Sequence, residues 1–264
     1  MSYLYEMHLH TKQASACASS RGSEYVKVYQ DLGYSGIFVT DHFMHGNNCI
    51  DRGLPWDEWV NCFCKGYEDA LNEGIRRGFD VFFAWEESFN GDDYLIYGLD
   101  KKWLLEHPQA GSWTRKEQYE AVTGSGGCVV QAHPFRQADY LRQICLSTGC
   151  VDGVEAANAC NGYAAFDALA MRYGQKFGFT LTAGSDIHNV GMALDKKVYG
   201  VYIDEKLESA KDYARIVRAR KIKNLKIPKG RCDFKGDEEV TLAVEIRDKN
   251  DNPAGGNWRK LLDM

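Results

Sequence analysis

Two histidines, His8 and His10, end the first apolar stretch of the sequence, MSYLYEMHLHT. Successive side chains of a strand point to opposite faces, so the two imidazoles share one face with Glu6. Two buried imidazoles without partners are costly to remove from water, whereas one metal ion would bind both. Asp186 and His188 repeat this spacing far along the chain. The two pairs therefore predict a metal site.

The remaining histidines extend this pattern. Of the seven in the chain, five stand at the ends of predicted strands: His8, His10, His42, His133 and His188. Active sites of α/β barrels lie at the C-terminal ends of their strands. Together with Glu86 and Asp186, the imidazoles form a mixed nitrogen and oxygen set that suits Zn²⁺, Mn²⁺ or Fe²⁺.

Short apolar runs alternate with helical patterns along most of the chain, which is typical of β–α units around a parallel sheet. The predicted strands are 3–9, 35–40, 79–85, 93–99, 128–132, 151–158, 179–185 and 198–203. The predicted helices are 23–33, 56–77, 114–127, 138–147, 163–178 and 206–220. We expect an α/β barrel domain over 1–225 and a small β-rich extension over 226–264.

Composition narrows the class of protein. The chain has 264 residues and a net charge of −5, which argues against non-specific coating of nucleic acid. Apolar runs are too short for a membrane helix and the N-terminus lacks a signal-peptide pattern, so we expect a cytoplasmic protein. Residues 215–231 carry eight basic side chains and no acidic ones. They are either a solvated helix face or a rim that attracts phosphate-bearing substrates.

Five motifs occur in an order and at separations that resemble the PHP (polymerase and histidinol phosphatase) family. They are EMHLHT, VTDHF, AWEESF, QAHPFR and AGSDIHN, and the resemblance covers about residues 3–220. It implies a distorted seven-stranded, TIM-like barrel with two or three divalent metal ions. It also implies phosphoester hydrolysis by a metal-activated water. The substrate would be a histidinol-phosphate-like molecule, a nucleotide or a short oligonucleotide.

The resemblance also assigns ligands to positions of this chain. One metal would be held by His8, His10, Glu86 and Asp186. Glu86 would bridge to a second metal bound by His133, and Asn158 either completes that site or only forms a strand-end turn. His42 and His188 would bind a third metal.

Three positions depart from the family pattern. Glu6 stands where the family usually has aspartate, and after His10 only Cys17 or a serine replaces a usual histidine or aspartate. The segment GDDYLIYG lacks the histidine that many members place after the bridging glutamate. Glu87 should point away from Glu86 on a strand, so we expect a supporting role for it.

The candidate catalytic residues are His42, Arg136 and His45. Arg136 could clamp a phosphate or form a surface salt bridge, and His45 could protonate a leaving group or be an ordinary loop residue. Two other functions stay open. An amidohydrolase-type barrel would call for a bridging lysine, and a metal-binding module without catalysis would serve a larger assembly.

Overall fold

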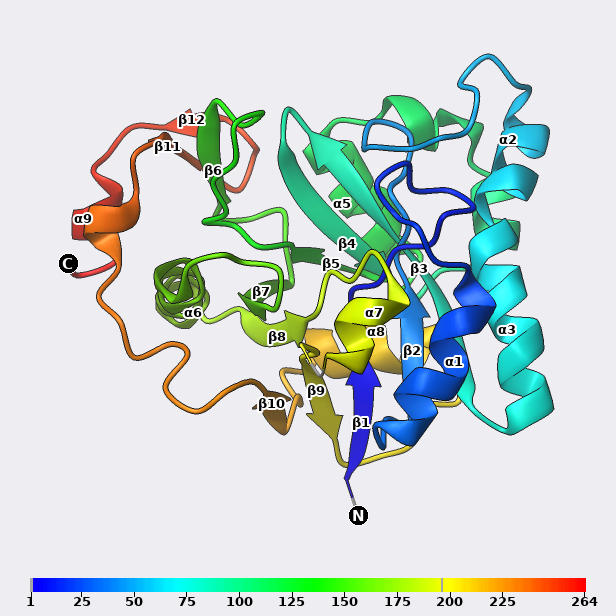
Figure 1. Ribbon diagram of the computed structural model, residues 1–264. Coiled ribbons are helices and arrows are strands. Elements are labelled where there is room, and N and C mark those ends of the chain that lie inside the picture. Colours follow the sequence, from blue (N-terminus) through cyan, green and yellow to red (C-terminus); the bar gives the residue numbers. More distant parts are fainter. Residues whose placement is uncertain (1, 196) are drawn as a thin grey trace.

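A sheet of nine strands, counted within the described residues 2–195 and 197–264 of the computed structural model, carries the predicted site. The strands are β1 (Tyr3–Glu6), β2 (Gly36–Val39), β3 (Asp80–Phe89), β4 (Asp92–Tyr97), β5 (Cys128–Gln131), β7 (Gly153–Asn158), β8 (Thr180–Gly184), β9 (Gly200–Ile203) and β10 (Asn224–Lys226). Their order is β10-β9-β1-β2-β3-β4-β5-β7-β8 (Figure 1). Strands β4 and β9 run against their neighbours, while β1, β2, β3, β5, β7 and β8 share one direction.

The sheet curls into a nearly closed barrel. The barrel closes at the C-terminal ends of the strands that share one direction. Leu9, just beyond β1, pairs in parallel with Ile187, just beyond β8. The backbone N–H of His10 donates to the carbonyl of Ile187 at 2.9 Å. A Cβ at Gly184 would lie 2.5 Å from the Cβ of His8, so glycine allows the two strand ends to approach. The predicted α/β barrel is confirmed, and its described sheet has nine strands where the resemblance implied seven.

Helices alternate with the strands along the chain and lie around the sheet (Figure 1). They are α1 (Gly22–Asp31), α2 (Trp56–Phe63), α3 (Lys65–Arg77), α4 (Lys101–Leu105), α5 (Arg115–Gly124), α6 (Ala164–Phe177), α7 (Val190–Leu194), α8 (Ala210–Arg218) and α9 (Trp258–Leu261). The single helix predicted over 56–77 is divided at Cys64. None of the described helices is long and apolar enough to cross a lipid bilayer.

The helix predicted over 138–147 is wrong. Residues Gln143–Ser147 form strand β6, which pairs in parallel with β11 (Ala243–Arg247). Ile144, Cys145 and Leu146 are buried in succession, so the segment has no helical apolar face. The pairing joins residues about a hundred positions apart, which a local pattern does not reveal.

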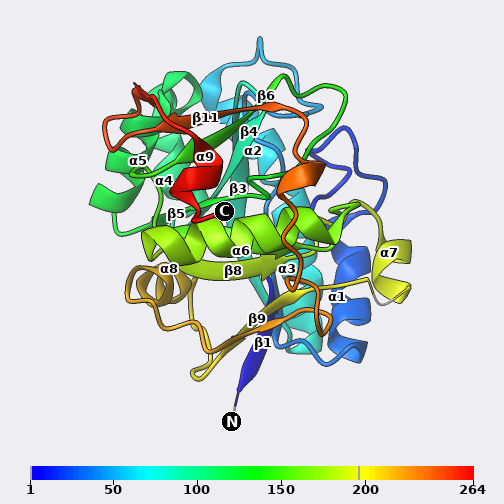
Figure 2. The ribbon, with the colours of Figure 1, turned by 90° about the vertical axis from the view of Figure 1, so that its left-hand side faces the viewer.

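The C-terminal residues complete a small three-stranded sheet, β12-β11-β6, in which β12 is Pro253–Ala254. Helix α6 lies beside this sheet, with α9 close by (Figure 2). Phe135, Leu146, Tyr173 and Trp258 share one apolar cluster, which ties the extension to the barrel. Because β10 belongs to the main sheet, that sheet reaches the predicted boundary at 225–226, and the division into two domains stays a prediction.

Apolar packing by α8 holds the strands that carry the site. Ser209 and Asp212 form a capping box that starts this helix. Tyr213 of α8 packs in one buried cluster with Tyr5, Phe38 and Val130 of three strands. The strand ends, where the sequence changes from apolar to polar residues, are thereby fixed relative to one another.

Candidate metal centre

Polar side chains from the ends of the strands that share one direction converge and form one buried cluster. Its members are His8 and His10 after β1, His42 after β2, Glu86 in β3, His133 after β5, and Asp186 and His188 after β8. Asp93 joins them from the start of β4, because this strand runs in the opposite direction. His133 and Asp186 have positive φ angles of 25° and 55°. Such backbone conformations in non-glycine residues gather at functional sites.

The carboxylate of Glu86 lies at the centre of the imidazoles. Its Oε1 is 3.1 Å from Nε2 of His8 and 3.3 Å from Nε2 of His133. Its Oε2 is 2.8 Å from Nδ1 of His42 and 3.6 Å from Nε2 of His10. Burial alone would raise the pKa of Glu86, but the imidazoles of His8 and His42 lower it well below its usual value. The carboxylate therefore faces two sides and could bridge two cations.

Asp186 forms a second anionic centre next to Glu86. Its Oδ1 is 3.1 Å from Nε2 of His10 and 3.5 Å from Nε2 of His8. Its Oδ2 is 2.5 Å from Nη1 of Arg136. Burial opposes ionisation of Asp186, but the guanidinium of Arg136 lowers its pKa well below its usual value. Asp186 is therefore present as a carboxylate that can bind a cation.

Three overlapping sets of donor atoms could each hold a metal ion. We name them the first group (His8, His10, Glu86), the second group (Glu86, Asp93, His133) and the third group (His10, His42, His188). Within each group the donor atoms lie within 4.8 Å of one another. A further set, His8, His133 and Asp186, overlaps the first two groups.

The donor atoms themselves show that divalent ions fit this centre. Several buried atoms make no well-aligned hydrogen bond among the described residues, although each lies close to a side chain of the opposite type: Nε2 of His8, Nε2 of His10, Nδ1 of His42, Oε2 of Glu86 and Oδ2 of Asp186. Buried polar atoms without a well-aligned hydrogen bond cost free energy of folding. Five such atoms in one cluster of imidazoles and carboxylates are the arrangement that a divalent cation would satisfy.

The ring nitrogens on the opposite side of these imidazoles are held by the protein. Nδ1 of His8 is 3.0 Å from Oε1 of Glu155, and Nδ1 of His10 is 3.2 Å from Oγ of Ser15. Ser15 is held in turn by Asp41, which accepts a hydrogen bond from its hydroxyl at 2.7 Å. Such contacts fix the orientation of the ring and leave Nε2 free to face the cluster.

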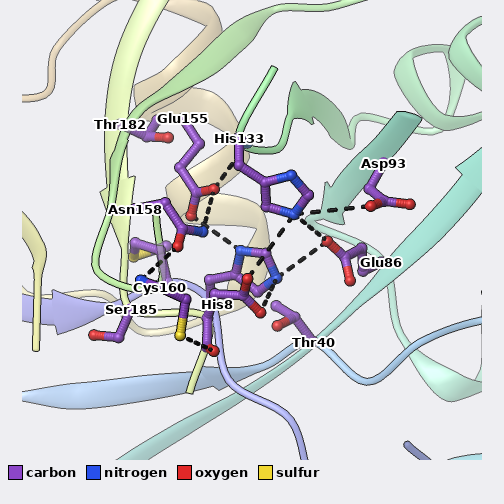
Figure 3. A network of polar contacts seen from close by, with 12 residues as sticks. His8, Thr40, Glu86, Asp93, His133, Glu155, Asn158, Cys160, Thr182 and Ser185 are labelled. Atoms are coloured by element: carbon purple, nitrogen blue, oxygen red, sulfur yellow. Dashed lines mark hydrogen bonds and ion pairs between the residues drawn. The ribbon is translucent and has the colours of Figure 1, made fainter. Parts of the chain in front are cut away.

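Asn158 and Glu155, both in β7, support the centre through hydrogen bonds to its residues (Figure 3). The amide of Asn158 donates to Oε2 of Glu155 at 2.8 Å, and its oxygen accepts from Nη2 of Arg136 at 2.8 Å. The same Oε2 of Glu155 accepts the backbone N–H of His133 at 3.0 Å. Both ends of the Asn158 amide are therefore engaged with protein groups, and its predicted role as a metal ligand stays untested.

Sequence reasoning missed Glu155 and Asp93. Glu155 lies in the buried run VEAAN. A carboxylate among small apolar residues was a signal that this side chain holds neighbouring polar groups. Asp93 lies in GDDYLIYG, the segment that lacks the usual histidine. Burial and the nearby charge of Glu86 raise the pKa of Asp93 to about 6. It offers an oxygen where the family pattern would have a nitrogen.

Asp167, buried in α6, connects the centre to the basic segment 215–231. It forms an ion pair with Arg231, whose Nε is 2.6 Å from Oδ2 of Asp167. The amide of Asn161 donates to Asp167 at 2.6 Å, and Nε of Arg136 donates to Asn161 at 3.2 Å. Arg231 thus supports Arg136 indirectly.

A cavity of about 430 Å³ opens beside the cluster. Glu86, Asp93, His133, Arg136 and His188 are among the residues that line it. None of the described residues 215–231 contributes to its wall, so the basic segment does not form a rim around it.

His45 also lines this cavity and is half exposed. Its backbone N–H donates to Oε1 of Glu87 at 3.0 Å, and its ring Nδ1 is 3.4 Å from Oε2 of Glu87. The hydrogen bond with Glu87 raises the pKa of His45. Buried Glu87 therefore points away from the cluster and supports the loop that carries His45.

Glu6 is fully buried, and its carboxylate joins the ends of β1 and β8. Oε1 accepts the backbone N–H groups of Met7, His8 and Ser185 at 2.8 to 3.0 Å. Oε2 accepts the hydroxyl groups of Tyr29 and Ser185. The glutamate thus fixes the strand end from which His8 projects.

Glu6→Ala is expected to destabilise the protein by about 3 kcal/mol, because it leaves buried donors without an acceptor. This corresponds to a Tm lower by roughly 6–12 °C, measurable by differential scanning calorimetry. The exposed Glu208→Ala serves as the control and should change Tm little. An unchanged Tm for Glu6→Ala would exclude this anchoring role.

Comparisons with known proteins agree with the fold. The sequence matches no protein-family model and no curated protein. Among solved structures, it is similar to a two-domain protein from Bacteroides vulgatus that contains a predicted PHP-like metal-dependent phosphoesterase, with a TM-score of 0.59 and 14% identity. The match covers 84% of this chain and 64% of that protein, so the chain spans less than two thirds of its length.

Two further structures have similar folds. One is a candidate metal-dependent phosphoesterase from Bifidobacterium adolescentis, with a TM-score of 0.52, 14% identity and coverage of 82% of this chain and 96% of that chain. The other is PsfC from Pseudomonas syringae, with a TM-score of 0.50, 13% identity and coverage of 88% and 94%. At these identities the likeness concerns the fold, and the protein has the PHP-type barrel fold that its sequence motifs predict.

Proposed function

We propose that the protein is a hydrolase that uses divalent metal ions to cleave a phosphoester bond in a small phosphorylated molecule or a short nucleotide. The observation that carries the proposal is the set of buried donor atoms around Glu86 that make no well-aligned hydrogen bond among the described residues. Three of the residues that carry these atoms, His42, Glu86 and Asp186, line a cavity together with Arg136. The similar fold of proteins described as metal-dependent phosphoesterases supports the same reaction class.

The first and second groups would share Glu86 between two ions. Asp186 would add an oxygen to the first group, since its Oδ1 lies close to both His8 and His10. When bound, divalent ions would polarise the phosphate oxygens and lower the pKa of water. The protein contributes the rigid arrangement of donors, which Glu6, Glu155 and Asp41 hold in place.

Arg136 would bind a phosphate oxygen of the substrate. Its guanidinium is held by Asp186, Asn158 and Asn161, so its direction is fixed before a substrate arrives. A planar guanidinium can bind two oxygens of one phosphate, which an ammonium group cannot match. Arg136 would thereby set the orientation of the phosphate in the cavity.

Arg136→Lys is expected to lower kcat/KM by about 10- to 100-fold, because it removes a hydrogen bond to a charged group worth roughly 1.5–3 kcal/mol. Steady-state kinetics on the best substrate would measure this change. Exposed Arg142→Lys is the matched control and should keep the wild-type value. Equal kcat/KM for the wild type and Arg136→Lys would show that Arg136 takes no part in the reaction.

His45 would donate a proton to the leaving oxygen of the substrate. It lines the same cavity as Arg136, and Glu87 favours the protonated imidazole. A protonated imidazole is a suitable general acid near neutral pH. Glu87 acts only through His45, so we regard it as a positioning residue.

The donor set favours this reaction over the amidohydrolase alternative. That alternative would call for a lysine between the metals, and no lysine is among the described residues that line the cavity. Glu86 would take the bridging position instead. The other alternative is a metal-binding module without catalysis. Whether the protein turns over a substrate decides between this alternative and the proposed hydrolase.

The experiment is a screen of the metal-reconstituted protein against phosphomonoesters and phosphodiesters, with a cyclic amide included, beside His8→Ala. We expect phosphate or alcohol release by the wild type and loss of that release in His8→Ala. Hydrolysis of the amide alone would favour the amidohydrolase alternative. Metal binding without turnover of any substrate would favour the non-catalytic module.

A further inference from the structure

The two edge strands of the main sheet, β8 and β10, meet without pairing. The strand order ends at β10 on one side and at β8 on the other, so within the described residues no ladder of hydrogen bonds joins these strands. They nevertheless approach each other beside β9 (Figure 1). Asp186 follows the C-terminal end of β8, so the start of this strand lies away from the metal centre.

A cavity of about 400 Å³ opens at this seam, and we name it the seam cavity. Thr180 and Leu181 from the start of β8 line it, together with Asn224 and Leu225 of β10. Its apolar wall consists of half-buried side chains: Met171, Phe179, Leu181, Ile222, Leu225 and Ile227. The volume is in the range of small-molecule sites. No acidic side chain is among the described residues that line it.

Arg220 brings an available positive charge to the seam cavity. Its side chain is exposed and lines the cavity, and its guanidinium lies against Gly178, where a Cβ would be 3.4 Å from Nη1. Three other basic residues of the segment 215–231 form ion pairs with carboxylates: Arg215, Lys223 and Arg231. Arg220 pairs with no carboxylate among the described residues. Its guanidinium can therefore bind an external anion.

The backbone of Arg220 is a second unusual feature of this place. Arg220 follows α8 with a φ of 56°, a left-handed conformation that glycine adopts most readily and that often ends a helix. An arginine here costs conformational free energy that glycine would not. The helix end does not account for this residue type, whereas an anionic ligand in the seam cavity would.

We propose that the seam cavity binds an organic anion, whose apolar body packs between β8 and β10 and whose charged group pairs with Arg220. The apolar wall would bury a ring or a short alkyl chain, and the guanidinium would bind a carboxylate, sulfonate or phosphate group. A bare inorganic anion would leave the apolar wall exposed. The site is separate from the proposed hydrolase site, because the two cavities share no described residue.

The test is a fluorescence titration of the full chain with anilinonaphthalene sulfonate, an aromatic anion that becomes fluorescent in apolar surroundings. We expect one saturable site in the wild type. Decanoate should displace the dye, whereas decanol and inorganic phosphate should displace it much more weakly. Decanol has the same chain without the charge, and phosphate has a charge without the chain.

Arg220→Gly should weaken binding of the dye by about tenfold or more, because it removes a hydrogen bond between charged groups. Glycine suits the left-handed backbone at this position, so the variant should remain folded. Lys221→Ala is the matched control, since it removes the adjacent exposed charge outside the cavity and should keep the wild-type affinity. Equal affinity of the wild type and Arg220→Gly overturns the assignment, and so does loss of binding in Lys221→Ala alone.

Opposite charges at Met171 test the apolar wall. Met171 is a half-buried residue of α6, where both glutamate and lysine are compatible with the helix. Met171→Glu should abolish binding by repelling the anion, and Met171→Lys should retain it. Circular dichroism would confirm that both variants are folded. Equal affinities of the two variants would place the dye elsewhere and overturn the proposal.

The remaining outcomes concern other occupants of the seam. Displacement of the dye by phosphate as effectively as by decanoate would show a site for charge alone and overturn the proposal. Sedimentation velocity would show whether a second copy of the chain covers the seam. A wild-type dimer that Met171→Glu dissociates would also overturn the small-molecule assignment.

Discussion

Glu86→Gln is expected to remove metal from the first and second groups and to lower kcat/KM by about 10³-fold or more. Glutamine has almost the same shape, but it lacks the negative charge and turns an amide donor toward the imidazoles. In the wild type the two carboxylate oxygens lie 2.8 to 3.6 Å from nitrogens of His8, His10, His42 and His133. A neutral side chain here cannot bridge two cations.

Metal analysis and steady-state kinetics on the same preparation would measure this effect. The exposed Glu106→Gln is the matched control, because it makes the same chemical change away from the centre. Both variants should give wild-type far-ultraviolet circular dichroism. Wild-type metal content and activity in Glu86→Gln would show that Glu86 bridges nothing.

Metal binding is expected to raise the Tm of the protein strongly. Buried carboxylates and ring nitrogens without well-aligned hydrogen bonds among the described residues destabilise the metal-free cluster, and a cation bound only by the folded state stabilises that state. With metal at 100 times its Kd, the gain is about 2.7 kcal/mol. For a chain of this size it corresponds to a Tm higher by roughly 5–11 °C.

Thermal unfolding with excess chelator and then with added Zn²⁺ would measure the shift. Glu86→Gln should gain much less Tm than the wild type, because the proposed two ions would share this side chain. A wild-type Tm that ignores both chelator and Zn²⁺ would contradict a metal-stabilised cluster. The same gain in Tm for Glu86→Gln as for the wild type would also contradict it.

The convergence of the main candidate ligands could be predicted because each stands at the end of a local apolar strand pattern. His8 and His10 share a face by the alternation of one strand, and the barrel brings strand ends together as a class property. Asp93 could not be placed this way, since it lies at the start of β4. Its position in the centre depends on β4 running against its neighbours, which no local pattern specifies.

The residues that hold the candidate ligands in place were harder to predict than the candidate ligands themselves. Glu155 holds His8 and the backbone of His133 from a different strand, so its role depends on the order of β5, β7 and β8. Cys17 was recognised only as a departure from the family pattern. Its neighbours in space follow from backbone hydrogen bonds to Asn47 and His188, which link residues far apart in the sequence.

The most direct test of the central claim is a zinc-edge anomalous difference map from crystals grown with Zn²⁺ and inorganic phosphate. The account predicts peaks between Glu86 and the imidazoles of His8, His10 and His133, with phosphate density next to Arg136. Crystals that bind zinc only at surface residues, with no peak beside Glu86, would contradict it.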